Sequence, residues 1–134
     1  MPKYKPPFKY GASKSKYHNV KTAIDGHVFD SKHEAERYMQ LKMLLKHGEI
    51  SDLVLQKEFI LIPAQYEPDT IDEKGKKVRG KCIERKCSYF ADFVYFDNYT
   101  QKFVVEDAKG EKTDVYKLKK KLMLERYNIK IKEV

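Results

Sequence analysis

The chain is poor in the features on which small secreted and membrane proteins depend. Its 134 residues include only two cysteines, Cys82 and Cys87, so a disulfide framework is not its main source of stability. No apolar run approaches the length of a transmembrane helix. The basic N-terminal stretch MPKYKPPFKYG has no apolar segment after it, unlike a secretory signal. We therefore expect a cytoplasmic protein with one domain and a modest core.

Residue patterns for several kinds of site are also missing. The two cysteines have C-x4-C spacing, but zinc needs two further ligands and the four histidines are scattered along the chain. We interpret both thiols as structural or incidental. The histidines show no nucleophile–base arrangement, and the sequence has no glycine-rich phosphate loop, so nucleotide-driven activity is not expected.

Charge is the most prominent feature that is present. The net charge is +8 and the pI is about 9.3, which favours a polyanionic partner, most commonly nucleic acid. The alternative is a soluble, lysine-rich protein without such a partner. No acidic residue precedes Asp25, whereas lysines and aromatic residues are interleaved there, a mixture that suits phosphate contacts and base stacking. Three prolines lie in the same stretch, so residues 1–16 are predicted to form a flexible basic arm, or alternatively a solubilising tail.

Residues 17–134 are predicted to form a single α/β domain. A hairpin should turn at Asp25-Gly26, a strong two-residue turn signal. A helix should follow from Ser31 to about His47, because SKHE has the spacing of a capping box and Gly48 is a natural residue after a helix end. The run ISDLVLQKEFILIP is rich in β-branched residues and predicts a strand.

The second half of the domain continues this mixed pattern. Residues 64–80 are polar and rich in turn residues, so we expect a surface loop or hairpin tip. Strands are predicted over about 82–97 and 102–109, a second helix from Thr113 or Asp114, and a closing strand in IKIKEV. The expected architecture is a central mixed sheet flanked by two main helices, with a small N-terminal hairpin.

The first helix places a carboxylate in line with its apolar side. At 3.6 residues per turn, Glu34 falls on one stripe with Tyr38, Leu41 and Leu45. One interpretation is that Glu34 only completes the capping box. The other is that its carboxylate points toward the sheet and takes part in a site.

Three more charged residues lie within apolar strand sequence. By alternation, Asp92 shares a face with Phe90 and Val94. Asp107 and Lys109 share the face of Phe103 and Val105, while Glu106 turns to the other side.

These charges are either a cross-strand salt bridge or a functional site. Buried ion pairs contribute little stability, because desolvation offsets most of their attraction, so we favour a site. Carboxylates that converge without histidine or thiolate favour Mg²⁺ or Mn²⁺. Such an ion activates water and neutralises charge on a phosphate, and a nearby lysine can orient the water or balance developing charge. In a basic protein, this chemistry suggests hydrolysis of phosphodiester bonds in nucleic acid.

The same residues resemble the PD-(D/E)XK nuclease superfamily, which has the restriction-endonuclease-like fold. The resemblance lies in a helical Glu34, then ADF with Asp92, then EDAKG with Asp107 and Lys109. It implies that Glu34, Asp92 and Asp107 are catalytic and hold the metal, and that Lys109 assists the attacking water. Ala91 stands where the motif has its proline. Glu106 is the alternative metal ligand if a bulge shifts the strand register, although only Asp107 shares a face with Lys109.

The wider pattern over about residues 16–134 is similar to small phage-encoded proteins of this superfamily. That similarity implies a Mg²⁺- or Mn²⁺-dependent DNA endonuclease in the bacterial host cytoplasm, acting on branched or duplex DNA in recombination or processing. Holliday-junction resolvases are the closest analogy, and cutting both strands of a junction implies a homodimer. Two rival hypotheses are a DNA-binding module without catalysis and a packaging-accessory protein with ordinary salt bridges.

The second helix supplies further candidates for DNA contacts. Val115, Leu118 and Leu122 are predicted to form its buried stripe. Lys117 and Lys120, with Lys121, then lie on the other side, as a phosphate-contacting or merely solvated face. Lys119 falls inside the apolar arc, where it could reach the site or extend to solvent. The nucleic-acid-binding candidates are Lys16, Lys21, Lys117, Lys119 and Lys120.

Overall fold

The computed structural model describes residues 21–108 and 111–134. The predicted arm at residues 1–16, with Lys16, lies outside this part of the chain, and so does Lys109. The described residues form two helices and ten strands in this order: β1 (Thr22–Ile24), β2 (His27–Phe29), α1 (Lys32–Lys46), β3 (Ile50–Ile62), β4 (Gln65–Tyr66), β5 (Thr70–Ile71), β6 (Lys77–Val78), β7 (Cys82–Glu84), β8 (Cys87–Asp97), β9 (Lys102–Asp107), α2 (Asp114–Tyr127) and β10 (Lys132–Glu133).

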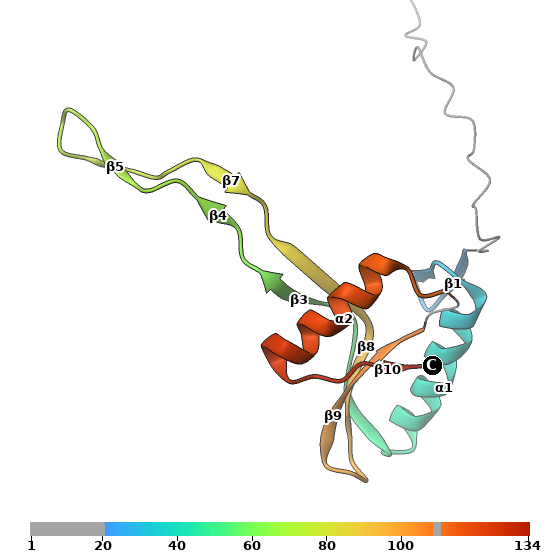
Figure 1. Cartoon of the computed structure of the whole chain (residues 1–134). Helices are drawn as coiled ribbons and strands as arrows, with labels where there is room; N and C mark the ends of the chain where they lie inside the picture. Colours follow the sequence, from blue (N-terminus) through green and yellow to red (C-terminus); the bar gives the residue numbers. More distant parts are fainter. Residues whose placement is uncertain (1–20, 109–110) are drawn as a thin grey trace, which may run out of the picture.

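A mixed four-stranded sheet in the order β10-β9-β8-β3 lies between the two helices (Figure 1). The pairs β3–β8 and β8–β9 are antiparallel, whereas β10 is parallel to β9. One hydrophobic cluster joins α1 to one face of the sheet and a second joins α2 to the other face. The predicted α/β architecture with a mixed sheet and two flanking helices is therefore confirmed. Among the described residues, neither helix has the length and apolarity needed to cross a membrane.

The N-terminal hairpin and the start of α1 follow the local sequence signals. Ile24 pairs with His27, and Asp25 and Gly26 both have positive φ, at 51° and 78°, as a type I′ turn requires. Ser31 is the N-cap, and its hydroxyl accepts a hydrogen bond of 3.1 Å from the Glu34 amide. The helix ends at the predicted place, since Gly48 follows the C-cap His47 with a φ of 74°.

The apolar stripe of α1 is confirmed for three of its four predicted members. Glu34, Tyr38 and Leu41 are buried, whereas Leu45 is 40% exposed. Leu44 packs against the core in its place. Positions three and four residues beyond Leu41 flank the same stripe, and at this last turn the earlier one faces the sheet.

The predicted buried stripe of α2 is confirmed for Leu122, which packs against the core, and is wrong for its other two members. Val115 and Leu118 are 63% and 59% exposed, whereas Tyr116 and Met123 are buried. The ring of Tyr116 lies 6.5 Å from that of Tyr89 on the sheet, and Tyr116 and Met123 belong to the same hydrophobic cluster. The helix has apolar residues on two neighbouring sides, one through Val115 and Leu118 and one through Tyr116 and Met123. Apolar spacing alone does not show which of the two sides is buried.

Beyond the sheet, the chain between β3 and β8 continues as a two-stranded projection, which we call the ribbon (residues 63–86; Figure 1). Short antiparallel ladders pair β4 with β7 and β5 with β6. The segment predicted as a surface loop or hairpin tip is thus the outer half of an ordered hairpin. Within residues 63–86 only Ala64 and Gly80 are half-buried, and the others are exposed.

Alternation along β8 changes its phase at Asp92. Before this residue, Tyr89 and Ala91 pack in the cluster of α2. After it, Phe93 and Tyr95 pack in the cluster of α1, although all four have odd numbers. The predicted common face of Asp92 and Val94 is therefore wrong, because Val94 packs against α2 while Asp92 lies toward α1.

The neighbouring strand changes phase at the same level. Leu53 and Leu55 pack in the cluster of α1, whereas Phe59 and Leu61 pack in the cluster of α2. Between them, Gln56 has a φ of 51°, in the left-handed region. The ladder pairs Leu55 with Phe93 and Lys57 with Ala91, so Gln56 and Asp92 lie opposite each other at the change of phase. Backbone in this region costs about 1–2 kcal/mol for a residue other than glycine, and such strain is concentrated at functional sites.

Candidate functional site

A single amide group joins the first two predicted site residues. Gln56 Nε2 donates hydrogen bonds to Glu34 Oε1 at 3.3 Å and to Asp92 Oδ1 at 3.0 Å. Glu34 is only 7% exposed, so its carboxylate lies between α1 and the sheet. The interpretation of Glu34 as a carboxylate directed toward the sheet is thus compatible with the N-cap at Ser31, because the cap uses the backbone amide of Glu34.

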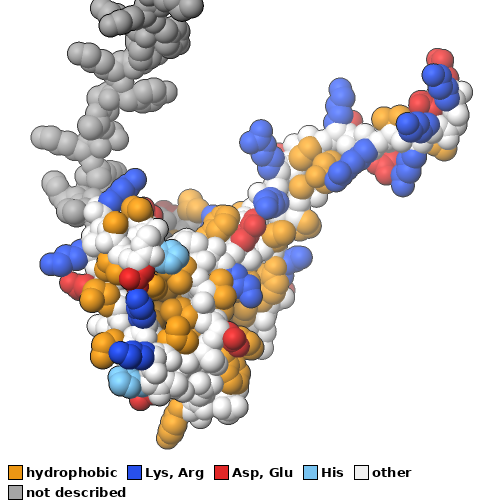
Figure 2. Space-filling view, turned by 180° about the vertical axis from the view of Figure 1, so that it is seen from behind, with side chains coloured by type: hydrophobic (Ala, Val, Ile, Leu, Met, Phe, Trp, Pro, Cys, Tyr) orange, Lys and Arg blue, Asp and Glu red, His pale blue; other side chains and the backbone are white. Residues whose placement is uncertain are grey.

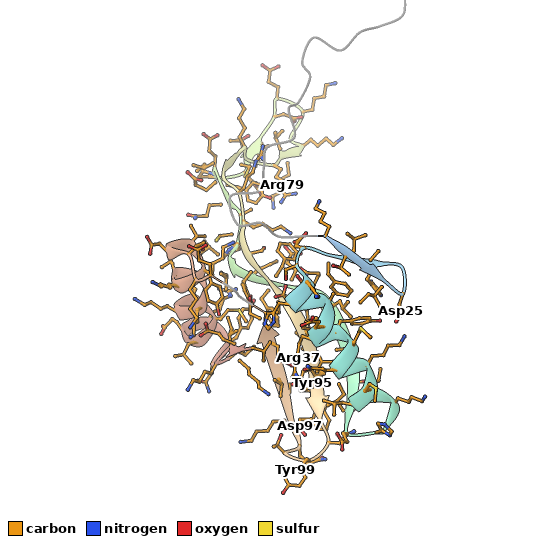
Figure 3. All side chains as sticks on the ribbon, turned by 90° about the vertical axis from the view of Figure 1, so that its right-hand side faces the viewer. Asp25, Arg37, Arg79, Tyr95, Asp97 and Tyr99 are labelled. Atoms are coloured by element: carbon orange, nitrogen blue, oxygen red, sulfur yellow. The ribbon has the colours of Figure 1, made fainter. Side chains whose placement is uncertain are left out.

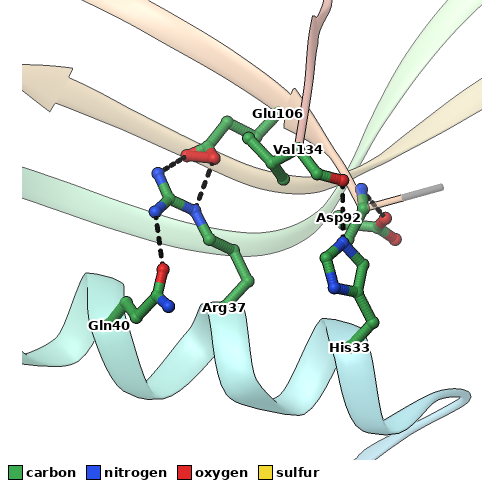
Figure 4. Close-up of polar contacts among 7 residues, drawn as sticks. His33, Arg37, Gln40, Asp92, Glu106 and Val134 are labelled. Carbon is green, nitrogen blue, oxygen red and sulfur yellow. Dashed lines mark hydrogen bonds and ion pairs between the residues drawn. The ribbon is translucent and has the colours of Figure 1, made fainter. Parts of the chain in front are cut away.

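Asp92 is also attached to the next strand. Its Oδ2 accepts a hydrogen bond of 2.8 Å from the backbone amide of Ala108, and the side chain lies beside the end of β9 (Figure 4). Asp92 therefore contacts the backbone directly after Asp107. The two predicted strand residues thus lie on adjacent strands, and Asp92 contacts the backbone that follows Asp107 rather than the Asp107 carboxylate.

Asp107 is nearly fully buried, at 1% exposure, on the face of α2. Its Oδ2 accepts a hydrogen bond of 2.5 Å from the Tyr89 hydroxyl. Burial, followed by this hydrogen bond and the charges of Asp107 and Asp92, raises the pKa of Tyr89 well above its ordinary value. Burial and the nearby carboxylates raise the pKa of Tyr116 in the same way. Asp107 and Asp92 thus both contribute to the raised pKa of each tyrosine, although burial is the largest cause.

The alternative ligand, Glu106, lies on the opposite face and has a different partner. Arg37 of α1 donates two hydrogen bonds to its carboxylate, at 2.7 and 3.1 Å, and a further one to Gln40 (Figure 4). Figure 3 shows Arg37 and Tyr95 together between α1 and the sheet. A hydrogen bond to Glu106 raises the pKa of Arg37, and burial together with Glu106 raises that of Tyr95. Glu106 is therefore fixed in a bidentate ion pair, which favours Asp107 as the functional carboxylate.

Solvent reaches Glu34 through a hollow of about 420 Å³ beside α1. Its walls are formed by the β1–β2 hairpin, the start of α1 and the middle of β3, and include His27, Phe29, Asp30, Glu34, Leu55 and Gln56. Of the bridged group, Glu34 and Gln56 therefore line this hollow.

The donor set fits a hard cation in chemical type. Glu34 and Asp92 offer carboxylate oxygens, and Gln56 would add a third oxygen if its amide rotated by a half-turn about the last bond. In the conformation observed, the amide nitrogen bridges the two carboxylates. Among the described residues, no group of three or more histidine, cysteine, aspartate or glutamate side chains is close enough to hold a metal ion.

The predicted DNA-binding lysines lie in different environments. Lys21 and Lys117 are exposed, while Lys119 and Lys120 are half-buried on the inward-turned side of α2. Lys120 pairs with Glu133. That carboxylate also contacts Lys112 at 2.9 Å, and its pKa is lowered by the hydrogen bonds from both lysines. Glu133 is the neighbour of Asp107 in the ladder between β10 and β9. The two lysines that bind Glu133 therefore lie next to the strand that carries Asp107.

Sequence reasoning missed Gln56 and Tyr89, the two residues that hold the carboxylates. Tyr89 lies in an ordinary strand sequence, and nothing around it indicates a hydrogen bond to a site carboxylate. Gln56 interrupts the apolar alternation of LVLQKEF, but a solvent-facing glutamine would do the same. Its positive φ, which distinguishes the two cases, is not visible in sequence.

Comparison with protein families assigns the chain to one of them. The family described as protein of unknown function (DUF1064) matches residues 14–133, and the chain belongs to this family. Comparisons with curated proteins and with solved structures gave no match.

Proposed function

We propose that this chain is a Mg²⁺- or Mn²⁺-dependent DNA endonuclease with a restriction-endonuclease-like core. The observation that carries the proposal is the hydrogen-bonded line from Glu34 through Gln56 to Asp92 and the backbone after Asp107. These bonds join an acidic residue of α1 and one of β8 to the backbone at the end of β9, at the change of phase in the sheet. A purely structural role would not require a buried carboxylate bridged by a residue in a strained backbone conformation.

The proposed roles follow from the donor chemistry. Glu34, Asp92 and Asp107 would hold the metal ion, which lowers the pKa of bound water and neutralises charge on the scissile phosphate. Lys109, two residues after Asp107, would orient the attacking water or balance charge in the transition state. The motif resemblance supplies the role of Lys109.

Electrostatics gives a reason why a cation is required. A phosphodiester is anionic and would be repelled by clustered carboxylates, even in a chain with net charge +8. A bound divalent ion reverses the local sign, so that the basic surface and the site both attract the backbone. We therefore expect DNA binding without metal and cleavage only with it.

For the substrate, we propose branched DNA such as a Holliday junction, with duplex DNA as the second choice. Symmetric cutting of a junction needs two active sites, so the active form would be a homodimer. Sedimentation of the protein with and without a four-way junction tests the oligomer separately from the chemistry.

The test is incubation of the full chain with labelled four-way junction, duplex and single-stranded DNA, with Mn²⁺ or with chelator. We expect metal-dependent nicks that are lost in Asp92→Asn, Asp107→Asn and Lys109→Ala. Glu36→Gln is the matched control, because Glu36 is an exposed carboxylate on α1. DNA binding without cleavage under any metal would support the non-catalytic DNA-binding alternative. Cleavage that survives in the three site variants would reject the assigned residues.

A further inference from the structure

The ribbon carries its charges in two separate blocks. Its outgoing half, PAQYEPDTIDE, contains four acidic residues and no basic one. Its returning half, KGKKVRGKCIERK, contains one acidic residue, Glu84, and seven basic ones: Lys74, Lys76, Lys77, Arg79, Lys81, Arg85 and Lys86. Figure 2 shows lysine and arginine side chains along this projection. The ribbon therefore has one acidic strand and one strongly basic strand.

Part of the acidic strand is used to shape the ribbon itself. Asp72 accepts hydrogen bonds from the backbone amides of Lys74 and Lys76, at 2.9 and 2.8 Å, and so closes the tip. Asp69 accepts one of 2.9 Å from the Gly80 amide and pairs with Lys77 at 3.3 Å. These carboxylates are directed at the ribbon's own backbone.

Much of the basic strand, in contrast, has no internal counter-charge. Arg79 stacks over the ring of Tyr66, 4.5 Å from its centre, and Figure 3 shows it in the ribbon, well away from the sheet. Lys86 pairs with Glu58 of β3 at 2.6 Å. Within the described part of the chain, no carboxylate forms an ion pair with the other four, Lys74, Lys76, Lys81 and Arg85. A run of exposed, uncompensated cations is what a polyanion requires.

We propose that the ribbon is a DNA-binding element that lies against the backbone of a duplex segment, with the returning strand toward the phosphates. A two-stranded ribbon fits the major groove of B-DNA. At about 3.3 Å per residue, the twelve steps between Pro63 and Gly75 extend on the order of 40 Å, about one helical turn of duplex. Exposed apolar side chains such as Ile71 and Ile83, at 75% and 61% exposure, would contact sugars and bases.

Self-association is the competing use of such a projection, and the charge pattern argues against it. A two-fold dimer formed by pairing ribbon edges brings the same edge of both copies together. That geometry would oppose basic strand to basic strand or acidic to acidic, and like charges on facing strands are destabilising. Charge complementarity therefore favours nucleic acid over a second copy.

The test is binding of a fluorescent four-way junction and a fluorescent duplex to the full chain in chelator, followed by anisotropy at several salt concentrations. The ribbon variant is Lys74→Ala/Lys76→Ala/Lys81→Ala. The control is Lys46→Ala/Lys102→Ala/Lys130→Ala, which removes the same charge from exposed lysines elsewhere. We expect the ribbon variant alone to bind at least tenfold more weakly, and the magnitude of its salt slope to fall by about 3, near one unit per lost phosphate contact. Equal affinities of the two variants overturn the proposal, and so does a loss of self-association in the ribbon variant without a change in DNA affinity.

This inference deepens the proposed function and rests on it only for the identity of the polyanion as DNA. Because the assay contains no metal, its outcome is independent of cleavage. Ribbon-dependent binding together with an absence of Mn²⁺-dependent nicks would reject the endonuclease and keep the ribbon assignment. Metal-dependent cleavage together with equal DNA binding by the two variants would keep the endonuclease and reject the ribbon assignment.

Discussion

Gln56 and Asp92 face each other across β3 and β8, and the glutamine amide donates to the aspartate at 3.0 Å. The same nitrogen reaches Glu34, so one side chain sets the separation of two carboxylates on different elements. The left-handed backbone of Gln56 places its side chain there. Gln56 therefore belongs to the positioning machinery of the proposed site.

We expect Gln56→Gly to separate function from stability. Glycine adopts a φ of 51° without strain, which offsets its greater entropy in the unfolded chain, so the free energy of unfolding should change by no more than about 1 kcal/mol. Loss of the amide should reduce Mn²⁺-dependent cleavage by about 10- to 100-fold, as for other groups that orient metal ligands. Urea unfolding and single-turnover cleavage measure the two effects. Gln40→Ala, at an exposed position of α1, is the control. Unchanged cleavage in Gln56→Gly would remove Gln56 from the site.

The ion pair between Arg37 and Glu106 should behave as a structural element. The Glu106 side chain is fully buried and that of Arg37 is 18% exposed, so removal of either partner leaves a poorly solvated charge. We expect Glu106→Ala to cost about 3 kcal/mol of unfolding free energy, and the Arg37→Ala/Glu106→Ala double variant to cost less than the sum of the single variants. Denaturant unfolding gives all three values. If Glu106→Ala instead leaves stability intact and abolishes cleavage, Glu106 replaces Asp107 as the metal carboxylate.

Alkaline pH should destabilise the fold through Tyr89. Burial and Asp107 raise its pKa in the folded state, so the proton is held more tightly there than in the unfolded chain. The resulting stabilisation is complete below the unfolded pKa of about 10 and decreases as pH rises above it. We expect the urea midpoint of the wild type to fall between about pH 9 and about pH 11, and to fall less in Tyr89→Phe.

At neutral pH, Tyr89→Phe should cost about 1–3 kcal/mol, because the buried Asp107 loses a hydrogen-bond donor. Tyr99→Phe should have no effect on stability at neutral pH, since Tyr99 is 94% exposed. An alkaline transition of equal size in Tyr89→Phe and wild type would assign the effect to other groups.

The ribbon should depend on Gly80 for its shape. A Cβ at this position would lie 1.8 Å from the Glu67 carbonyl oxygen, so any side chain must displace the outgoing strand. We expect Gly80→Ala to weaken DNA binding severalfold while the melting temperature of the sheet and helices is preserved. Gly75→Asn is the matched control, because its position is open and asparagine tolerates the positive φ of 77°. Anisotropy and calorimetry distinguish the two variants, and equal binding would show that ribbon geometry does not matter.

Local signals predicted most of the fold, because they act through neighbouring residues. The Asp25-Gly26 turn, the Ser31 cap and the end of α1 near Gly48 are each specified by a few side chains. The inward side of α2 depends on which residue meets Tyr89, a contact that spacing does not reveal.

The sequence predicted which residues make up the candidate site better than it predicted how they are arranged on the sheet. Alternation correctly placed Asp107 with Val105 and opposite Glu106, because β9 is regular. It failed at Asp92, where the strand changes phase opposite the left-handed Gln56 of the neighbouring strand, a pairing that sequence does not display. The ribbon was underestimated for a related reason, since polar turn-rich sequence is common to loops and to exposed hairpins.

The change of phase at Gln56 and Asp92 makes the two ends of the β3–β8 hairpin unequal in their tolerance of insertions and deletions. One residue added to β8 just after Asp92 would exchange the residues facing α1 with those facing α2, and both hydrophobic clusters would be lost together. In the ribbon, matched pairs of residues can be added to or removed from both strands without disturbing any core. Relatives of this chain should therefore differ in the length of the ribbon, while the number of residues between Asp92 and Asp107 stays constant. Ribbon length would then be the variable that adapts an unchanged site to nucleic acids of different shape.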